Sequence, residues 1–222
     1  MFVKICGITT EDDALLAVAM GADAVGFIFA PSERQVAPQH VYDITRRLPA
    51  ETMTVGVFRN ELPERVLSLA DKAGVKAVQL HGSETPEQVA EIVERGPGHG
   101  IRWVIKAFGA DSPHLARADR FHTDVVLVDA PSPGSGKVFD WHITADVPDS
   151  LRLILAGGLN PDNVADAVAA VEPWGVDVSS GVELAPGRKD AVKVRQFISN
   201  ARSASPNPYI GPDDLPYNWE DE

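Results

Sequence analysis

Cys6 is the single cysteine of this 222-residue chain, and its position suits it for chemistry. It ends the apolar run Phe2-Val3-Lys4-Ile5, and Gly7 then interrupts the pattern before an acidic helix start. A thiol at the open end of a strand is either inert packing or a reactive group, because its reactivity depends on how far the surroundings favour the thiolate. The neighbouring charges must therefore decide between these two interpretations.

The nearest such charge is Lys4, which shares a strand face with Cys6 because side chains two residues apart point the same way. An ammonium group one layer beneath the thiol would be buried, and a buried charge requires a partner. In the run 175–179, Val176 and Val178 suit the side that faces the helices, so Asp177 between them should point into the barrel. Asp177 is therefore the predicted partner of Lys4.

Short β-branched runs alternate with segments of helical period along the whole chain. They predict eight strands, at residues 2–6, 24–29, 53–58, 76–80, 102–107, 124–129, 151–156 and 175–179. Helix starts and glycine stops separate them, as at Thr9-Thr10-Glu11-Asp12 and at Gly74. This alternation favours a single closed (β/α)8 TIM barrel over an open doubly wound sheet, since no G-x-G-x-x-G follows the first strand.

Chemistry in such a barrel belongs at the C-terminal ends of the strands. The residues predicted there are too polar for packing alone: Cys6, Phe29, Phe58, Arg59, His81, Lys106, Asp129, Gly157, Gly158, Ser179, Ser180 and Gly181. Strand parity places Val126 and Val128 against helices, which turns Asp129 into the barrel. No spacing of His, Cys or carboxylates resembles a metal site, so no metal is expected.

Two loops that contain glycine or serine predict a phosphate site. Ala156-Gly157-Gly158-Leu159-Asn160 closes the seventh strand, and Ser179-Ser180-Gly181-Val182-Glu183 closes the eighth. Glycines let backbone N–H groups approach an anion closely, and barrels often bind phosphate between these two loops. A strand-to-helix turn would explain either loop alone, but their occurrence on consecutive strands favours phosphate-binding residues Gly157, Gly158, Ser179, Ser180 and Gly181.

Composition limits the partners and the location. The chain carries 20 Lys and Arg against 32 Asp and Glu, a formal net charge of −12, which repels nucleic acid and anionic membranes. No apolar run reaches the roughly 18 residues of a membrane span, and no signal-peptide pattern precedes the first strand. One cysteine forms no internal disulfide, so we expect a cytoplasmic protein. Residues 1–202 should form the barrel domain, and the proline-rich, acidic segment 203–222 an irregular C-terminal tail.

Seven blocks of sequence carry a family resemblance, and their combination is more specific than any one of them. In order they are VKICGIT (3–9), GADAVGF (21–27), VGVF (55–58), VQLHG (78–82), GSGKVFDW (134–141), GGLNP (157–161) and DVSSGVE (177–183). They resemble the phosphoribosylanthranilate isomerase family of tryptophan biosynthesis. The resemblance implies a (β/α)8 barrel that needs no cofactor. It also implies an Amadori rearrangement of N-(5′-phosphoribosyl)anthranilate to 1-(o-carboxyphenylamino)-1-deoxyribulose 5-phosphate.

The resemblance also implies roles for the thiol and the carboxyl group. Asp129 would be the general acid, protonating the furanose ring oxygen so that the ring opens to a Schiff base. Cys6, as thiolate, would be the general base that removes the C2′ proton to give an enolamine, which then tautomerises. Lys4 would favour the thiolate, and partial desolvation would keep Asp129 protonated. The expected partner is a small phosphosugar.

Four residues are predicted to bind substrate: Lys4, Arg34, His81 and Asp177. Family members carry an arginine near the position of Arg34 that binds the anthranilate carboxylate, and a guanidinium fork suits a carboxylate. His81 is expected either to hydrogen-bond the substrate or to cap a turn. The loop that carries Arg34 looks about one residue shorter than usual for the family. The loop 130–137 keeps the glycine-rich pattern of a lid.

Three other functions remain open. The related histidine-pathway isomerase uses an aspartate on the first strand and has two phosphate loops, whereas this first strand ends in Cys6 and Phe58-Arg59-Asn60 offers no second phosphate loop. A non-catalytic phosphometabolite sensor on the same barrel would keep the loops without the chemistry, but Cys6 and Asp129 are both present. A structural or interaction protein has only the acidic composition in its support. We expect a monomer or a homodimer.

Overall fold

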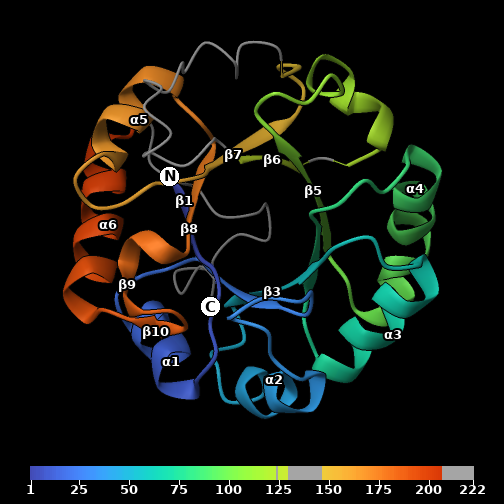
Figure 1. Ribbon diagram of the computed structural model, residues 1–222, viewed down its shortest axis with the longest axis horizontal. Helices are drawn as coiled ribbons and strands as arrows, with labels where there is room; N and C mark the ends of the chain where they lie inside the picture. Colours follow the sequence, from blue (N-terminus) through green and yellow to red (C-terminus); the bar gives the residue numbers. More distant parts are fainter. Residues whose placement is uncertain (124, 130–146, 207–222) are drawn as a thin grey trace, which may run out of the picture.

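Eight parallel strands close into a barrel in the structure, a computed structural model that describes residues 1–123, 125–129 and 147–206. Neighbouring strands follow chain order, from β1 beside β2 round to β8 beside β1 (Figure 1). Their bounds are β1 Phe2–Ile5, β2 Ala24–Ile28, β3 Met53–Phe58, β4 Ala77–Leu80, β5 Trp103–Gly109, β6 Val125–Asp129, β7 Arg152–Ala156 and β8 Gly175–Val178. The predicted (β/α)8 barrel is confirmed.

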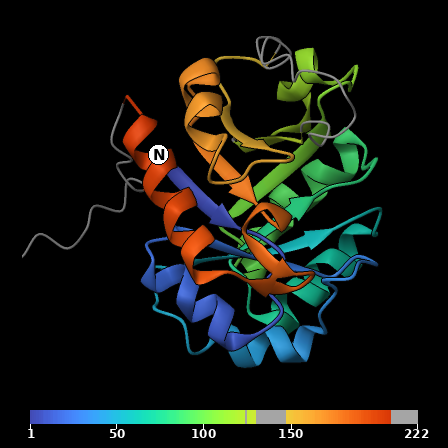
Figure 2. The same cartoon turned by 60° about the vertical axis from the view of Figure 1, so that its left-hand side comes forward.

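The helices of the described residues surround the strands on the outside of the barrel (Figure 1). They are α1 Glu11–Ala19, α2 Pro38–Thr45, α3 Pro63–Ala73, α4 Pro86–Arg95, α5 Val164–Val171 and α6 Ala191–Ala204. Local signals explain their starts: Thr10 accepts a hydrogen bond from the Asp13 N–H, and Thr85 forms a capping box with Gln88. The C-terminal α6 lies alongside α5 and β1, as Figure 2 shows from a second direction.

The connection between β5 and β6 departs from the predicted alternation of strand and helix. It contains the 3₁₀ helix η2, Leu115–Phe121, in place of an α-helix. Its buried residues Leu115, Ala118 and Phe121 are three apart, which is the repeat of a 3₁₀ helix. The backbone is not helical at Arg117, so the segment is kinked and does not form one continuous helix.

Some predictions fall on residues outside the described part of the chain. They are the lid pattern at 130–137, the block at 134–141 and most of the C-terminal tail. The helix α6 runs through Ala204, so the first two residues assigned to the tail belong to this helix. Between α6 and β8 lie a short 3₁₀ helix η4, Ser180–Val182, and a hairpin of β9, Glu183–Ala185, and β10, Arg188–Lys189.

Every strand is buried on both faces, because one face lines the barrel and the other packs against helices. On β6, Val125 and Leu127 belong to the inner cluster while Val126 and Val128 pack outward, which confirms the predicted parity. At the N-terminal end of the barrel the inner cluster is closed by aromatic rings, since Phe2 stacks on Trp174 with centroids 4.6 Å apart. Polar residues lie at the opposite end of the barrel, where the strands have their C-terminal ends.

An ion pair lies inside the barrel where its first and last strands meet. The register of β1 and β8 sets Lys4 directly opposite Asp177, and Lys4 Nζ lies 2.8 Å from Asp177 Oδ1. The Lys4 side chain is fully buried. This confirms Asp177 as the predicted partner of the buried lysine.

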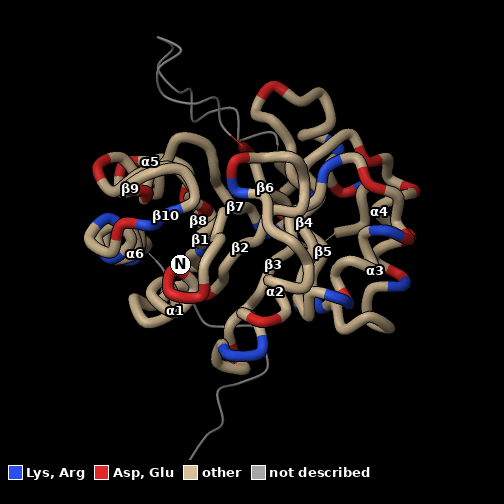
Figure 3. Tube along the Cα trace, turned by 60° about the horizontal axis from the view of Figure 1, so that its bottom comes forward, with Lys and Arg blue, Asp and Glu red and all other residues tan. Residues whose placement is uncertain are grey.

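Acidic and basic segments are interspersed on the outer helices, as Figure 3 shows for α3 and α4. Arg95 at the end of α4 donates to Glu91 on its own helix and to Glu64 on α3, at 2.5 and 3.1 Å. The acidic excess of the chain is thus partly paired on this side. Of the helices in the described residues, none combines the length and the apolar character needed to cross a membrane.

Candidate active site

A pocket of about 230 Å³ opens at the C-terminal ends of the strands. It brings together most of the predicted site residues: Cys6, His81, Asp129, Gly157, Gly158, Asp177, Ser179, Ser180 and Gly181. Lys4 lies beneath it and does not line it, and Arg34 lies beside Ser179. The thiol, the carboxyl group and both predicted phosphate loops therefore share one pocket.

The Cys6 thiol occupies space that a glycine on the next strand leaves open. A methyl group at Gly26 of β2 would lie 2.8 Å from Cys6 Sγ and 3.2 Å from Lys4 Cε. Cys6 itself is only 6% exposed, and its N–H donates to the carbonyl of Val178. The thiol is thus held at the floor of the pocket directly above the buried ammonium.

Lys4 favours the Cys6 thiolate, as predicted, but other groups around the thiol oppose this effect. Burial raises the pKa of the Cys6 thiol above its ordinary value, and the nearby carboxylate of Asp177 raises it further. The ammonium of Lys4 lowers this pKa but does not outweigh the other two effects. The largest effect is burial, and Asp177, which pairs with Lys4, offsets part of the positive charge near the thiol.

Asp129 does not stand alone at the end of β6. Its Oδ2 lies 3.2 Å from Nε2 of His81, and His81 Nδ1 lies 3.2 Å from Nε2 of Gln79. The structure therefore assigns His81 a contact with the predicted acid. The Asp129 side chain is 41% exposed.

The two phosphate loops pack directly against each other. A methyl group at Gly181 would lie 1.9 Å from the carbonyl oxygen of Leu159, so only glycine fits this crossing. Gly157 and Gly158 have φ of 88° and 63°, which favours glycine at both positions. The hydroxyl of Ser179 is buried in the pocket wall and has no hydrogen-bond partner among the described residues. Such an unsatisfied donor suits an incoming anion.

Arg34 is held by an acidic residue that the sequence analysis left without a role. Its Nε and Nη2 donate to the two carboxylate oxygens of Glu183 at 2.8 and 2.6 Å. Lys189 also donates to Glu183, at 2.9 Å. Burial alone would raise the pKa of Glu183, but the hydrogen bonds from Arg34 and Lys189 hold it below its ordinary value. Among the described residues, Nη1 of Arg34 has no hydrogen-bond partner, so it is available to a ligand.

A second pocket, of about 440 Å³, shares His81 with the first and lies over β4 and β5. Its wall contains an ion pair, in which Lys106 Nζ lies 3.0 Å from Glu84 Oε2. The backbone N–H groups of Asn60 and Gly82 also donate to Glu84. Lys106, predicted at the barrel mouth, thus joins β5 to the loops after β3 and β4 through Glu84.

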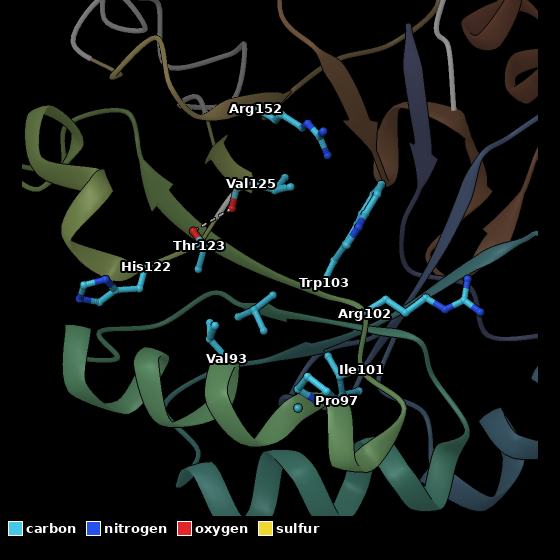
Figure 4. A pocket seen from close by; sticks show the side chains of 11 residues that line it. Val93, Pro97, Ile101, Arg102, Trp103, His122, Thr123, Val125 and Arg152 are labelled. Atoms are coloured by element: carbon cyan, nitrogen blue, oxygen red, sulfur yellow. Dashed lines mark hydrogen bonds between the residues drawn. The ribbon is translucent and has the colours of Figure 1, made fainter. Parts of the chain in front are cut away.

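A third pocket, of about 100 Å³, lies at the other end of the barrel (Figure 4). Trp103, Val125 and Arg152, at the N-terminal ends of their strands, contribute to its wall. The hydroxyl of Thr123 donates to the Val125 carbonyl there, at 3.2 Å. None of the predicted site residues lines it.

Sequence reasoning missed Gln79, Glu183 and Gly26. Gln79 was recoverable, because it shares a face of β4 with His81 two residues later. Gly26 and Glu183 were not, since their roles depend on contacts with Cys6 and Arg34 across the fold. Within residues 1–123, 125–129 and 147–206, no three His, Cys, Asp or Glu side chains gather as metal ligands would.

Comparison with known proteins identifies the family of this chain. A family model described as N-(5′-phosphoribosyl)anthranilate isomerase matches residues 3–200 of the chain. The isomerase of that name from Desulforudis audaxviator (strain MP104C) is 49% identical over 209 residues, covering 91% of this chain and 98% of the relative. The chain belongs to the N-(5′-phosphoribosyl)anthranilate isomerase family. The predicted family resemblance is thereby confirmed.

Solved structures of the family share the fold. One is phosphoribosylanthranilate isomerase in complex with reduced 1-(o-carboxyphenylamino)-1-deoxyribulose 5-phosphate, with a TM-score of 0.80 and 43% identity. Another contains monomers generated from the dimeric isomerase of Thermotoga maritima, again with a TM-score of 0.80 and 43% identity. Each similarity covers 91% of this chain and 99% of the solved chain. Family membership therefore extends over the whole barrel.

Proposed function

We propose that the chain catalyses the Amadori rearrangement of N-(5′-phosphoribosyl)anthranilate to 1-(o-carboxyphenylamino)-1-deoxyribulose 5-phosphate in tryptophan biosynthesis. The observation that carries this proposal is the single pocket lined by Cys6, Asp129 and both phosphate loops. Membership in the isomerase family and the relative bound to the reduced ligand support the choice of substrate.

In this proposal Asp129 is the general acid and Cys6 the general base. Asp129 protonates the furanose ring oxygen as the bond from that oxygen to C1′ breaks, which leaves a Schiff base between C1′ and the anilino nitrogen. The Cys6 thiolate then removes the proton from C2′, and the electron pair moves through C1′ to the nitrogen. The resulting enolamine takes up a proton at C1′ and loses the proton of its C2′ hydroxyl, which becomes the carbonyl of the ketose. The reaction needs no cofactor.

The remaining predicted site residues bind the substrate or act on the Cys6 thiol. Gly157, Gly158, Ser180 and Gly181 offer backbone N–H groups to the phosphate, and the Ser179 hydroxyl supplies the donor that lacks a partner in the described residues. Arg34 binds the anthranilate carboxylate through Nη1 while Glu183 holds its other edge. Lys4 acts from beneath the pocket through the thiol, and Asp177 pairs with Lys4 while lining the pocket, where it can contact the substrate.

The proposal extends to the setting of the enzyme. We expect residues 1–202 to be the catalytic barrel domain and 203–222 a tail outside it. The enzyme would work in the cytoplasm as a monomer or homodimer on a small phosphosugar, without nucleic acid or membrane. Light scattering coupled to gel filtration would determine which of the two states is present.

The test is turnover of phosphoribosylanthranilate generated in situ from anthranilate and phosphoribosyl pyrophosphate. Wild-type protein should convert the fluorescent substrate far faster than the buffer reaction, and the product should be the deoxyribulose phosphate by mass and chromatography. Absence of turnover, together with binding of the reduced ligand, would replace the isomerase by the non-catalytic sensor.

A further inference from the structure

Gln79 is a buried polar residue in the barrel to which the proposed mechanism gives no role. It lies on β4, is only 1% exposed and lines the same pocket as Cys6 and Asp129. Its Nε2 lies 3.2 Å from Nδ1 of His81. Its Oε1 is buried and has no hydrogen-bond partner among the described residues.

Packing alone does not explain an amide at this position. A buried acceptor without a partner costs about 1–3 kcal/mol. A methionine or leucine of similar volume would fill the same space without that cost. Because the fold would be no worse with an apolar side chain, the reason for Gln79 lies in what its amide touches, which is His81.

The contact with Gln79 decides which nitrogen of His81 carries the proton. The amide N–H of Gln79 donates to Nδ1, so Nδ1 holds a lone pair and the proton of the neutral ring is on Nε2. That Nε2 lies 3.2 Å from Oδ2 of Asp129. One hydrogen bond and one close contact thus form a chain from Gln79 through His81 to Asp129.

The reversed amide would break this chain. If Oε1 of Gln79 faced the ring, Nδ1 would carry the proton and a lone pair on Nε2 would face the lone pairs of Asp129 Oδ2. Two acceptors at 3.2 Å repel each other, so an Oδ2 that carries no proton selects the arrangement in which the Gln79 amide N–H donates. The geometry of all three residues therefore agrees on a single tautomer.

We propose that Gln79 is a positioning residue for the general acid. By fixing the tautomer of His81 it directs the Nε2–H to Oδ2 of Asp129, which leaves Oδ1 as the oxygen that carries the transferred proton. The proposal rests on the proposed function of Asp129, but the tautomer of His81 is measured without turnover. Failure of one can therefore be told from failure of the other.

The first arm of the test measures the tautomer by ¹⁵N NMR of the imidazole rings, at about two pH units above the ordinary histidine pKa of about 6.5. His81 is identified by the signals that His81→Asn removes. Wild type should show the proton on Nε2. In Gln79→Glu the introduced carboxylate accepts from the ring, so Nδ1 should carry a proton that it lacks in the wild type. A proton on Nδ1 in the wild type would overturn the proposal without any variant.

The second arm measures kinetics in Gln79→Met, which keeps the volume and removes the donor. We expect kcat to fall between about 10-fold and 100-fold while KM changes by less than about twofold. The melting temperature should stay at the wild-type value or rise, because the unpaired Oε1 is gone. Gln196→Met, at an exposed position of α6, is the matched control and should leave kcat unchanged. Wild-type kcat in Gln79→Met, or a lower kcat with an unchanged His81 tautomer, would overturn the proposal.

Discussion

The protonation state of Cys6 determines when the proposed base is available. Burial and Asp177 raise the pKa of the thiol, and Lys4 lowers it. Because the pKa is raised, the thiolate is the minor form at neutral pH. Its fraction increases as the pH rises past the ordinary thiol pKa of about 8.5. The dependence of kcat/KM on pH should therefore still be rising there.

Removal of the Asp177 charge should shift the pH range in which kcat/KM rises. In Asp177→Asn the negative charge that raises the pKa of Cys6 is gone and Lys4 acts on the thiol without compensation, so the pKa falls. The rise in kcat/KM should move to lower pH, measured as a profile from about pH 6 to 10. Asp71→Asn, at an exposed position, is the control and should leave the profile in place. A profile that stays or moves upward in Asp177→Asn would remove Cys6 as the titrating base.

Single residues were predictable where a local pattern decides their direction. Strand parity was enough to turn Asp177 and Asp129 inward and to pair Lys4 with Asp177. It was not enough for the pKa of Cys6, because burial there depends on the bare Gly26 of the next strand and on a pair that neutralises Lys4. The electrostatic sum around a buried group is a property of the folded barrel.

At the scale of elements, the loops after β7 and β8 form one unit. Their contact is the crossing of Gly181 and Leu159, which leaves no room for a side chain. The loops after β2 and β8 are joined by a second contact, the ion pair of Arg34 and Glu183. The proposed phosphate and carboxylate sites are thus connected through the segment that follows β8.

A methyl group at the loop crossing should damage phosphate binding first. In Gly181→Ala the loops must separate, because the new carbon would meet the Leu159 carbonyl at 1.9 Å. KM should rise by about 10-fold or more, which corresponds to the loss of one or two hydrogen bonds to a charged group. Gly98→Ala is the matched control, since nothing lies within 4 Å of the new methyl group. Steady-state kinetics of both variants make the test, and an unchanged KM in Gly181→Ala would exclude a phosphate site at this crossing.

The strands and the glycine turns were predictable because their signals are local. Alternation, β-branched residues and turn glycines placed all eight strands and the two loops after β7 and β8. The connection η2 was missed because its three-residue spacing resembles a short α-helix. The partner of Arg34 was missed because Glu183 lies far along the chain and no pattern joins them.

At the scale of the whole molecule, the barrel closes between its first and last strands. The pair of Lys4 and Asp177 spans this junction inside the barrel. Burial alone would lower the pKa of Lys4, but Asp177 and Cys6 raise it. Stability from the pair is therefore complete below the ordinary lysine pKa, about 10.4, and is lost as the pH rises through the raised folded value.

Breaking this pair from one side should weaken the whole barrel. Lys4→Met leaves a buried carboxylate without its partner, which costs about 3 kcal/mol, or about 6–12 °C in melting temperature for a chain of this size. The double variant Lys4→Met with Asp177→Leu should recover much of the loss. Lys72→Met, exposed on α3, should change stability by less than about 0.5 kcal/mol. Thermal unfolding measures all three, and equal melting temperatures for Lys4→Met and Lys72→Met would contradict a role in closure.

The fold as a whole was predictable because eight strands and their helical connections leave few topologies that bury both faces of a parallel sheet. The family could also be predicted, since its blocks fall at the strand ends that form the pocket. The contacts of His81 with Gln79 and Asp129 could not be predicted, because they join the end of β4 to β6, which lies two strands away.

The most direct test of the proposed acid and base is the rate of phosphoribosylanthranilate conversion by wild type, Cys6→Ala and Asp129→Asn side by side. The account predicts wild-type turnover and a loss of about 10²-fold to 10⁴-fold in kcat for each variant. Melting temperatures should stay close to that of the wild type for Asp129→Asn, whose side chain is part-exposed. Near-full turnover by a correctly folded Cys6→Ala or Asp129→Asn would contradict the role assigned to that residue.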